Sequence, residues 1–387
     1  MTNHTQPDET PDEFVDPRAD RFDRLHTLRE QGVDPYAVEQ FNRKVPIERV
    51  TANFTKYEKH KRVRVAGRLY QLKVMGGASF AFLEDETGRI QIRAERNELG
   101  EIHYRQFCKL LHAGDILGIS GELIKTKTGE ITIRIKNYKI LALCVRNMNA
   151  GKEKDGIRHG ALADVEQRYR MRYVDLHANP LARETMIKRI KIVQTMRRYL
   201  EDRGFLEVET PTLQQEAGGA AARPFKTHHN ALDYDFKLRI ALELPLKRLI
   251  VGGFEKVYEI GRVYRNEGID RQHNPEFTLL ELYQAYTNLD GMMDLVEKMY
   301  TACCVAVNGE PRFLAKIEKN NEVIREEWVD MSSHPWRRLP ILEGIREYAG
   351  IAPEELTDLA SAKAACERVG VPTEKEHTVG GIIEKLH

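Results

Sequence analysis

The sequence predicts an α+β protein in which a small β-barrel precedes a larger domain that combines long helices with an antiparallel sheet. Two observations support this prediction. Residues 61–145 form short runs of alternating apolar side chains separated by turn signals, whereas residues 182–284 contain one long amphipathic helix and two runs of period two. The chain has 387 residues, too many for one ordinary core, so we expect two domains or more.

Composition narrows the class of protein. Charged residues make up 31% and hydrophobic residues 41%, which suits a soluble globular protein, and the net charge of +1 means that any nucleic-acid surface must be local. Residues 1–17 are polar and acidic, so we expect a disordered tail and no signal peptide. No apolar run approaches a membrane span. The five cysteines lack zinc-site spacing and are expected to be reduced thiols, as in a cytoplasmic protein.

The first ordered element expected is a helix at 18–31. Phe22, Leu25 and Leu28 recur at the spacing of one helical face, and a glycine and a proline follow. The rest of residues 18–60 is expected to connect this helix to the barrel.

Residues 61–150 are expected to form the barrel. Five runs read as strands: "RVRVAGRLY", "ASFAFLED", "RIQIRAE", "DILGISGEL" and "EITIRIKNYKILAL", with the helical stretch "EIHYRQFCKLLHA" between the third and fourth. That layout is typical of an OB-fold. The region holds 16 Lys/Arg and 9 Asp/Glu, a difference of +7, which favours single-stranded nucleic acid as the ligand. The alternative is a barrel with another role and a solvated basic face.

A charge-rich linker is expected over 151–181, and a long helix over 182–203. One face of that helix carries apolar residues at spacings of three and four, and Gly204 ends the helix. These residues are Met186, Ile190, Val193, Met196 and Leu200. "FLEVETPTL" then reads as a strand interrupted by a proline. We interpret the basic side chains of the helix as its solvated face, not as an RNA-binding stripe: Lys188, Arg189, Lys191, Arg197 and Arg198.

Two runs of period two, "KVYEIGRVYRNEG" and "EFTLLELYQAY", predict an antiparallel hairpin. An arginine fork suits a phosphate or a carboxylate, a phenylalanine ring suits a purine, and carboxylates accept from amino groups. The set therefore suits a nucleoside triphosphate beside an amino-bearing substrate; the alternative is an ion-paired, solvent-facing sheet. If the two strands pair with their faces aligned, one surface carries Arg265, Glu267, Phe277, Glu281 and Tyr283, with His273 and Asn274 in the loop at its mouth.

These residues carry a specific resemblance. "VYRNEGIDRQHNPEFTLLELYQAY" resembles motif 2 of the class II aminoacyl-tRNA synthetases, in particular of the lysyl-tRNA synthetases, and "RGFLEVETPTL" resembles motif 1. "GGAAARPFKTHHNALDYDFKLRIALEL" is similar to the lysyl family's segment between those motifs, and "ASFAFLEDETGRIQ" and "TKTGE" are similar to its anticodon-binding OB domain. The resemblance covers roughly residues 20 to 387.

The resemblance implies a fold and a function. An N-terminal OB-fold barrel would precede a class II synthetase catalytic domain, built on an antiparallel sheet, over residues 182–387. The reaction would be ATP-dependent activation of L-lysine to lysyl-adenylate, followed by transfer to tRNA(Lys). Mg²⁺ would accompany ATP, and motif 1 would form the interface of a homodimer.

The resemblance also implies roles for single residues. Arg265 and Glu267 would be catalytic. ATP would be held by Arg265, Glu267, His273, Asn274 and Phe277, with Phe277 under the adenine. Lysine would be held by Gly219, Glu243, Arg265, Glu281 and Tyr283. The anticodon would be read by Phe80, Gln91 and Glu130.

The sequence departs from the family in three places. Leu242 and Pro245 replace the usual residues around Glu243, and Gln272 stands where the motif 2 loop usually has arginine. Motif 3, with its second ATP-binding arginine, and the acidic magnesium ligands have no counterpart before residue 387. The resemblance therefore predicts an incomplete catalytic domain that has no metal ligands and activates lysine poorly.

Other interpretations stay open. A catalytically inactive tRNA-binding relative would also keep the barrel, whereas the lysyl-transferase paralogues that modify a translation factor lack it. Phe80 could belong to the barrel core. His228 and His229 could suggest a metal pair, but adjacent strand residues point to opposite faces. Cys303 and Cys304 are expected to lie in a helix and to contribute to its packing.

Overall fold

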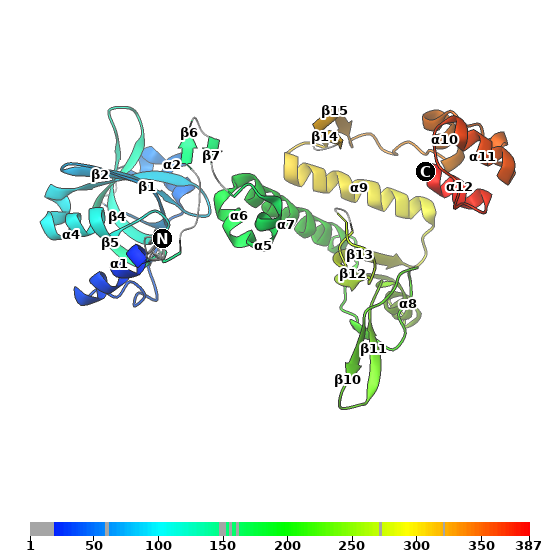
Figure 1. Cartoon of the computed structure of the whole chain (residues 1–387), viewed down its shortest axis with the longest axis horizontal. Coiled ribbons are helices and arrows are strands. Elements are labelled where there is room, and N and C mark those ends of the chain that lie inside the picture. The colour runs from blue at the N-terminus through cyan, green and yellow to red at the C-terminus, as the bar shows by residue number, and fades with distance from the viewer. Residues whose placement is uncertain are drawn as a thin grey trace, which may run out of the picture. The chain divides into compact units, whose positions relative to one another are not determined.

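The computed structural model describes residues 19–58, 62–146, 152–154, 157–159, 162–270, 273–319 and 322–387. The expected disordered tail at 1–17 lies outside these ranges. The chain divides into two compact units, Met1–Arg183 and Glu184–His387. Figure 1 labels the elements of both. In the described part of the chain, no helix is both long and apolar enough to cross a membrane.

The first unit contains a closed five-stranded barrel of strand order β1-β2-β3-β5-β4. The helix α4 (Arg96–Leu110) lies between the third and fourth strands in the chain, so the predicted OB-type layout is confirmed. Strand β3 runs parallel to β5, and all other neighbours are antiparallel. The strands are β1 (Val63–Met75), β2 (Ala78–Glu84), β3 (Arg89–Glu95), β4 (Ile116–Lys125) and β5 (Ile131–Ala142).

The barrel core follows from the period of two. In β2 and β3 every second residue is buried, including Ala81, Leu83, Ile90 and Ile92, and the residues between them face outward. Burial of the leucine and isoleucine side chains contributes roughly 1.5–3 kcal/mol each. The alternation therefore fixes which side chains of β2 and β3 are left on the outer face.

The N-terminal helix α1 (Ala19–Glu30) confirms the predicted helix and is fastened to the barrel by a buried ion pair. Arg24 Nη1 lies 2.8 Å from Asp115 Oδ2, and both side chains are buried. The same carboxylate accepts from the backbone N–H groups of His112 and Cys144. The short helices α2 (Ile47–Ala52) and α3 (Phe54–Tyr57) follow in the connector.

The segment expected to be a linker contains ordered elements. It holds the short strands β6 (Lys152–Lys154) and β7 (Ile157–His159) and the helices α5 (Val165–Arg170) and α6 (Arg172–Ala178). Asp175 is fully buried and pairs with Arg168 at 2.7 Å and with Arg172 at 2.5 Å. The charges that suggested a linker thus include an internal ion-pair cluster.

The second unit is built around a three-stranded sheet of order β13-β12-β8. The long helix α7 (Pro180–Glu201) ends just before Gly204, whose φ is +80°, as the sequence predicts. "FLEVETPTL" is split by its proline into two short strands in different sheets. The strands are β8 (Leu206–Glu207), β9 (Leu213–Gln214), β10 (Lys226–His229), β11 (Tyr234–Leu238), β12 (Lys256–Tyr264) and β13 (Glu276–Gln284).

Helices cover both faces of this sheet. Tyr258 of β12 packs in one cluster with residues of α7 and α9 (Leu289–Asn308). Val257 and Val263 point to the other face and pack with α8 (Glu243–Val251). In Figure 1, the β10–β11 ribbon extends away from β12 and β13.

The last part of the chain consists of a hairpin and a helical cluster. The hairpin joins β14 (Arg312–Lys319) to β15 (Glu322–Asp330). The cluster has its own apolar core, which includes Ile345, Leu356, Cys366 and Ile382. Its elements are α10 (Ile341–Ala349), the 3₁₀ helix η1 (Pro353–Leu356), α11 (Leu359–Arg368) and α12 (Val379–Leu386).

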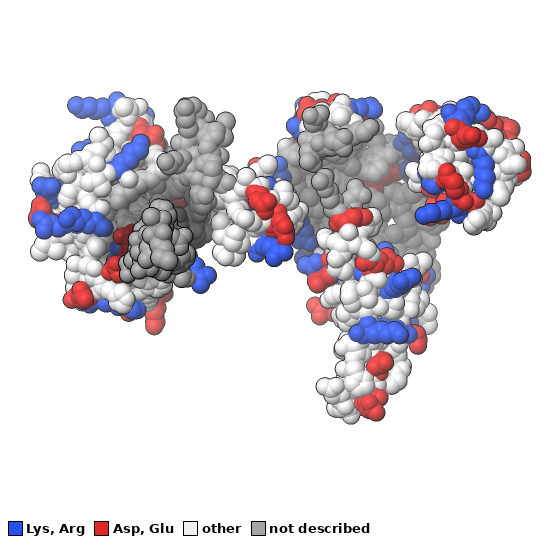
Figure 2. Space-filling view, viewed as in Figure 1, with Lys and Arg blue, Asp and Glu red and all other residues white. Residues whose placement is uncertain are grey.

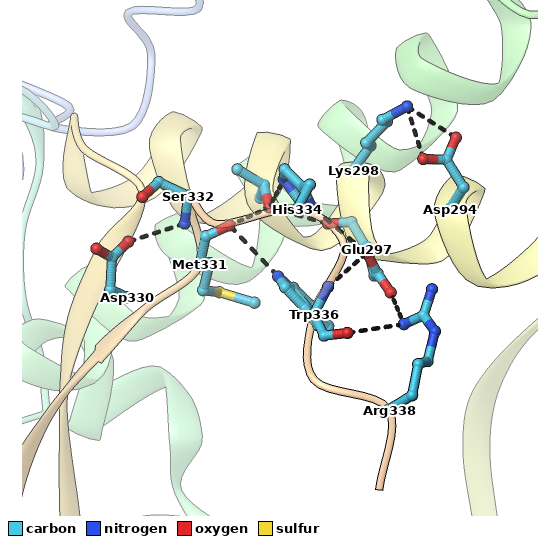
Figure 3. A network of polar contacts seen from close by, with 10 residues as sticks. Asp294, Glu297, Lys298, Asp330, Met331, Ser332, His334, Trp336 and Arg338 are labelled. Carbon is cyan, nitrogen blue, oxygen red and sulfur yellow. Dashed lines mark hydrogen bonds and ion pairs between the residues drawn. The ribbon is translucent and has the colours of Figure 1, made fainter.

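A buried carboxylate anchors the segment between the hairpin and the helical cluster. Glu297 of α9 is 3% exposed and accepts from the Arg338 guanidinium, from the Trp336 backbone N–H at 3.1 Å and from His334 at 3.5 Å (Figure 3). The Thr301 hydroxyl donates to the Met331 carbonyl at 2.9 Å one turn further along α9. These contacts hold residues 331–338 against α9.

We predict that Glu297→Ala releases this segment, because three donors lose their acceptor at once. In a Trp328→Phe background, which leaves Trp336 as the only tryptophan, emission should shift to the red. Trypsin should cut faster after Arg337 or Arg338. Asp294→Ala, which removes an exposed pair with Lys298 on the same helix, is the control and should change neither readout.

The anchor should also depend on pH. The Arg338 guanidinium, then the Trp336 N–H and His334, hold the pKa of Glu297 below its ordinary value of 4.5. A carboxyl with a lowered folded-state pKa stabilises the fold above its unfolded pKa, and this contribution is lost as the pH falls. The Trp336 emission should therefore stay constant at neutral pH and shift only below about pH 4.5. At pH 7, an emission shift in the Asp294→Ala variant as large as the shift in Glu297→Ala would contradict the assignment of the anchor to Glu297.

Candidate active site and nucleic-acid interface

The β12–β13 hairpin pairs in the register that the sequence predicts. Val263 lies opposite Phe277, Glu259 opposite Glu281, and Val257 opposite Tyr283. Facing residues of an antiparallel pair point to the same side of the sheet. The aromatic and acidic candidates of β13 therefore share the face that α8 covers in part.

At one end of this face, an arginine lies over an aromatic ring. The Arg265 guanidinium is 5.1 Å from the centre of the Phe277 ring, and the Arg265 backbone N–H donates to the Pro275 carbonyl at 2.8 Å. Arg265 Nε is buried without a hydrogen-bond partner. A buried donor without an acceptor costs about 1–3 kcal/mol, so its place suits a ligand that supplies an oxygen atom.

The other nucleotide candidates lie around the loop that follows β12. Glu267 is exposed and accepts from the Arg223 backbone N–H at 3.4 Å, while the Asn266 N–H donates to the Arg223 carbonyl at 2.7 Å. These contacts tie the glycine-rich 218–223 segment to the end of β12.

The described loop residues are open to solvent. His273 Nδ1 lies 2.8 Å from Asp270 Oδ2, and Asn274 is exposed just before β13. Arg271 and Gln272, where the sequence departs from the family pattern, lie outside the described residues.

At the other end of the face, the four remaining lysine-binding candidates lie together. Glu281 Oε1 accepts from the Leu242 N–H at 3.0 Å, and Glu281 Oε2 accepts from the Tyr283 hydroxyl at 3.3 Å. Gly219 has a φ of +89°, and a Cβ there would lie 2.9 Å from the Glu243 Cβ. Glycine thus lets the 218–223 segment approach Glu243 closely.

The two carboxylates at this end, Glu243 and Glu281, differ in their partners. Glu243 pairs with Lys247 at 2.6 Å. Glu281 accepts only from neutral donors and, within the described part of the chain, makes no ion pair. Burial, followed by the charges of Glu281 and Glu243, raises the pKa of Tyr283 above its usual range, so its hydroxyl remains a donor. This end of the site thus presents one uncompensated negative charge.

The proline that replaces the family residue after Glu243 is accommodated. Pro245 lies in the first turn of α8, which begins at Glu243. The N–H groups of the first turn have no partner within the helix, so proline removes no hydrogen bond there. The geometry around Glu243 is therefore compatible with the role that the resemblance implies.

Sequence reasoning missed a buried ion pair on the same face. Arg239, just after β11, pairs with Glu259 of β12 at 2.6 Å, and both side chains are buried. Glu259 also accepts from the Thr210 N–H at 3.1 Å and hydroxyl at 2.7 Å. A charged residue at an apolar position of β12 is the signal that could have found it.

The barrel presents a basic and aromatic outer surface. Phe80 of β2 is half-buried on the opposite side from Ser79 and Ala81, which contradicts the interpretation of Phe80 as barrel core. The Arg93 guanidinium lies 5.5 Å from the Phe80 ring, and Arg93 lies opposite Phe80 on one side and opposite Arg134 on the other. On the face of the protein seen in Figure 2, basic and acidic side chains are interspersed, so a nucleic-acid surface must be local.

Phe80 and Gln91 lie on the neighbouring strands β2 and β3, and Glu130 lies in the turn just before β5. The Thr132 hydroxyl donates to Gln91 Oε1 at 2.7 Å and to the Glu130 carbonyl at 3.3 Å, so Gln91 and Glu130 are joined through one residue of β5. The Nε atoms of Arg93 and Arg134 are buried without hydrogen-bond partners. Donors of this kind beside a half-buried ring on the outer surface suit an RNA base or phosphate.

The remaining sequence interpretations concern histidines and cysteines. His228 lies on exposed β10 between Asp233 and Asp235, at 3.3 Å and 2.9 Å. The described residues contain no group of three or more His, Cys, Asp or Glu side chains that could hold a metal ion. Cys303 and Cys304 are buried in α9, as predicted, and all five cysteines are free thiols.

Comparison with known proteins agrees with this architecture. Residues 164–378 match the family described as tRNA synthetases class II (D, K and N), and residues 63–141 match the OB-fold nucleic acid binding domain. The chain belongs to the class II tRNA synthetases of this group, with an N-terminal OB-fold domain.

Its relatives include three proteins that bear the same name, Lysine--tRNA ligase. That of Thermoanaerobacter sp. (strain X514) is 45% identical over 363 residues, which cover 94% of this chain and 69% of the relative. That of Carboxydothermus hydrogenoformans is 46% identical, with 94% and 70% covered. That of Clostridium botulinum (strain Loch Maree / Type A3) is 44% identical, with 92% and 67% covered.

Proposed function

We propose that this chain acts as a lysine--tRNA ligase, which activates L-lysine with ATP to lysyl-adenylate and transfers the lysyl group to tRNA(Lys). The observation that carries the proposal is the carboxylate of Glu281, which has no cationic partner and lies beside a half-buried tyrosine, on the same face as an arginine with an unused donor. A single negative charge in a partly buried site selects a side chain that ends in an ammonium group, because a neutral side chain leaves the carboxylate unpaired.

In this proposal the nucleotide lies at the Arg265 end of the face. Adenine stacks on Phe277, and Glu267, His273 and Asn274 contact the nucleotide from the loop. Arg265 reaches both the α-phosphate and the lysine carboxylate, so it holds the nucleophile in line and stabilises the charge that develops during displacement. The unpartnered Nε of Arg265 supports this role.

The amino acid lies at the other end. Gly219 and Glu243 receive the α-ammonium group, and Glu281 and Tyr283 receive the ε-ammonium group. The close approach of Gly219 to Glu243 and the hydrogen bond between Tyr283 and Glu281 support this arrangement. The α-ammonium group competes with Lys247 for Glu243.

ATP and Mg²⁺ are generally used by class II synthetases. The described residues do not provide a matching cluster of carboxylates for the ion. We therefore assign no magnesium ligand in this chain and derive no step through the metal.

The barrel is proposed to bind the anticodon of tRNA(Lys). Phe80 stacks on one base, and Gln91 and Glu130 contact base edges. The match of residues 63–141 to a nucleic acid binding domain supports this assignment. The Nε atoms of Arg93 and Arg134 also support it, because they have no hydrogen-bond partner although the two guanidinium groups pair with glutamates of the barrel.

We also propose that the chain forms a homodimer through the motif 1 region and works in the cytoplasm. Met186, Ile187 and Ile190, neighbours on α7, are large apolar side chains left exposed, and Leu206 of β8 in the motif 1 segment is also exposed, which supports an interface. The five free cysteines are compatible with a reducing compartment.

The proposed lysine site predicts that Glu281→Gln weakens lysine binding at least about 100-fold, because loss of one partner of a buried charge pair costs about 3 kcal/mol or more. Titration calorimetry with L-lysine measures this change. Glu276→Gln is the matched control, since Glu276 lies on the same strand but is exposed and pairs with Arg262 at 3.4 Å. Equal affinities for the two variants would contradict the proposed site.

The proposed anticodon surface predicts that Phe80→Ala weakens binding of the tRNA(Lys) anticodon stem–loop by about 1–3 kcal/mol, the contribution of one stacked base. Fluorescence anisotropy with the labelled stem–loop measures the loss. Ile102→Ala, which truncates an exposed side chain of α4, should leave the affinity unchanged. Equal losses from both substitutions would rule out a specific stacking role for Phe80.

The proposed interface predicts that Ile190→Glu converts a dimer to a monomer, because it buries a charge in an apolar contact. Sedimentation velocity distinguishes the two states. Lys191→Glu, one position further along α7, places the same charge on the polar side and should leave a dimer. A native chain that sediments as a monomer would refute the interface.

A further inference from the structure

The buried pair of Arg239 and Glu259 has no role in the function proposed above, although it lies on the same face of the hairpin. Arg239 Nη1 is 2.6 Å from Glu259 Oε1, and the two side chains are 6% and 5% exposed. Buried ion pairs are not in themselves strongly stabilising, since apolar residues of similar size often replace them at no cost. A buried pair beside a binding site therefore raises the question of what it does there.

The guanidinium of Arg239 has a fixed position. Its Nε donates to the Arg262 carbonyl at 2.8 Å, and its Nη1 donates to the Thr210 carbonyl at 2.9 Å. It also lies directly against Gly261, where a Cβ would be 2.4 Å from Nη2. The glycine leaves the space that the guanidinium fills, so Arg239 lies across β12 between the two ends of the site.

This position matters because Glu259 lies directly opposite Glu281 in the hairpin. Facing residues of an antiparallel pair have Cβ atoms about 4.5–5.5 Å apart and point to the same side. Glu259 is compensated by Arg239, whereas Glu281 accepts only from the Leu242 N–H and the Tyr283 hydroxyl. Of these two neighbouring carboxylates, Glu259 is thus paired with a cation, whereas Glu281 is bound only by neutral donors.

We propose that Arg239 is a positioning residue for recognition of the substrate's ε-ammonium group: it pairs with Glu259 and thereby leaves Glu281 as the one carboxylate of the two that has no cationic partner. This inference rests on the proposed function. Among the residues that the structure describes, the other charged and titratable side chains at this end are Glu243 and Lys247, which pair with each other, and Tyr283, which is a neutral donor.

The role has a consequence that a purely structural ion pair lacks. Without the Arg239 guanidinium, Glu259 and Glu281 are two uncompensated carboxyl groups at facing positions of the hairpin, and such a pair takes up one proton more readily than a single carboxyl group does. Uptake of one proton lowers the charge of the pair from −2 to −1, which weakens its attraction for the ammonium group. Lysine binding then weakens as the pH falls, by up to about tenfold per pH unit.

The test is titration calorimetry of the full chain with L-lysine at pH 6, 7 and 8. Arg239→Gln keeps a hydrogen-bond donor for Glu259 but removes the charge. Arg239→Lys keeps the charge, and Arg239→Met combined with Glu259→Leu removes both members of the pair without leaving a buried charge. Circular dichroism establishes that each variant is folded.

We expect the affinity of Arg239→Gln for lysine to fall by about tenfold or more from pH 8 to pH 6. The native chain, Arg239→Lys and the double variant should change by less than about twofold, because Glu281 then has no unpaired carboxylate beside it. A flat profile for folded Arg239→Gln would overturn the inference.

Two further outcomes keep the test decisive. If Arg239→Gln does not fold, the double variant provides the test instead. A folded double variant that does not bind lysine, or whose affinity depends steeply on pH, also overturns the inference. If the native chain itself does not bind lysine, the proposed function fails, and that failure is distinct because it precedes any substitution.

Discussion

The register of the β12–β13 hairpin is the constraint on which the catalytic unit depends. Side chains alternate along a strand, so a slip of β13 by one residue would turn Phe277, Glu281 and Tyr283 towards α7 and α9 and bring Leu280 and Leu282 to the site. The apolar clusters on both faces of the sheet oppose such a slip, because each needs its own set of side chains buried. The packing that stabilises the sheet therefore also positions the site residues of β13.

The same principle orders the barrel. Ala81, Leu83, Ile90 and Ile92 point inward, so Phe80 and its neighbours must point outward. Pairing of β2, β3 and β5 then aligns an aromatic ring with two arginines across three strands. In both units, buried donors without acceptors lie among the outward-facing candidates for ligand binding. A buried donor of this kind destabilises a folded protein unless a ligand or a water molecule supplies an acceptor.

Much of this architecture can be predicted from the sequence, because it depends on local periodicity. Alternation predicts the five barrel strands and both strands of the hairpin, and the spacing of apolar residues with Gly204 predicts α7 and its end. The site residues of β13 could be placed on one face by the same alternation. What periodicity cannot supply is a partner far away in the chain. Arg239 and Glu259 belong to different elements, as do Glu297 and Arg338, and each pair forms only when the tertiary fold brings them together. The helices at 165–178 were missed for a related reason, since their charges neutralise one another around buried Asp175.

The central claim is that one face of the hairpin binds lysine and a nucleotide side by side. Titration calorimetry of the chain with a non-hydrolysable lysyl-adenylate analogue, compared with L-lysine and with AMP, tests it most directly. Because the analogue engages both ends of the face at once, the account predicts that it binds at least about a hundredfold more tightly than either fragment. An analogue that binds no more tightly than lysine or AMP alone would contradict the account.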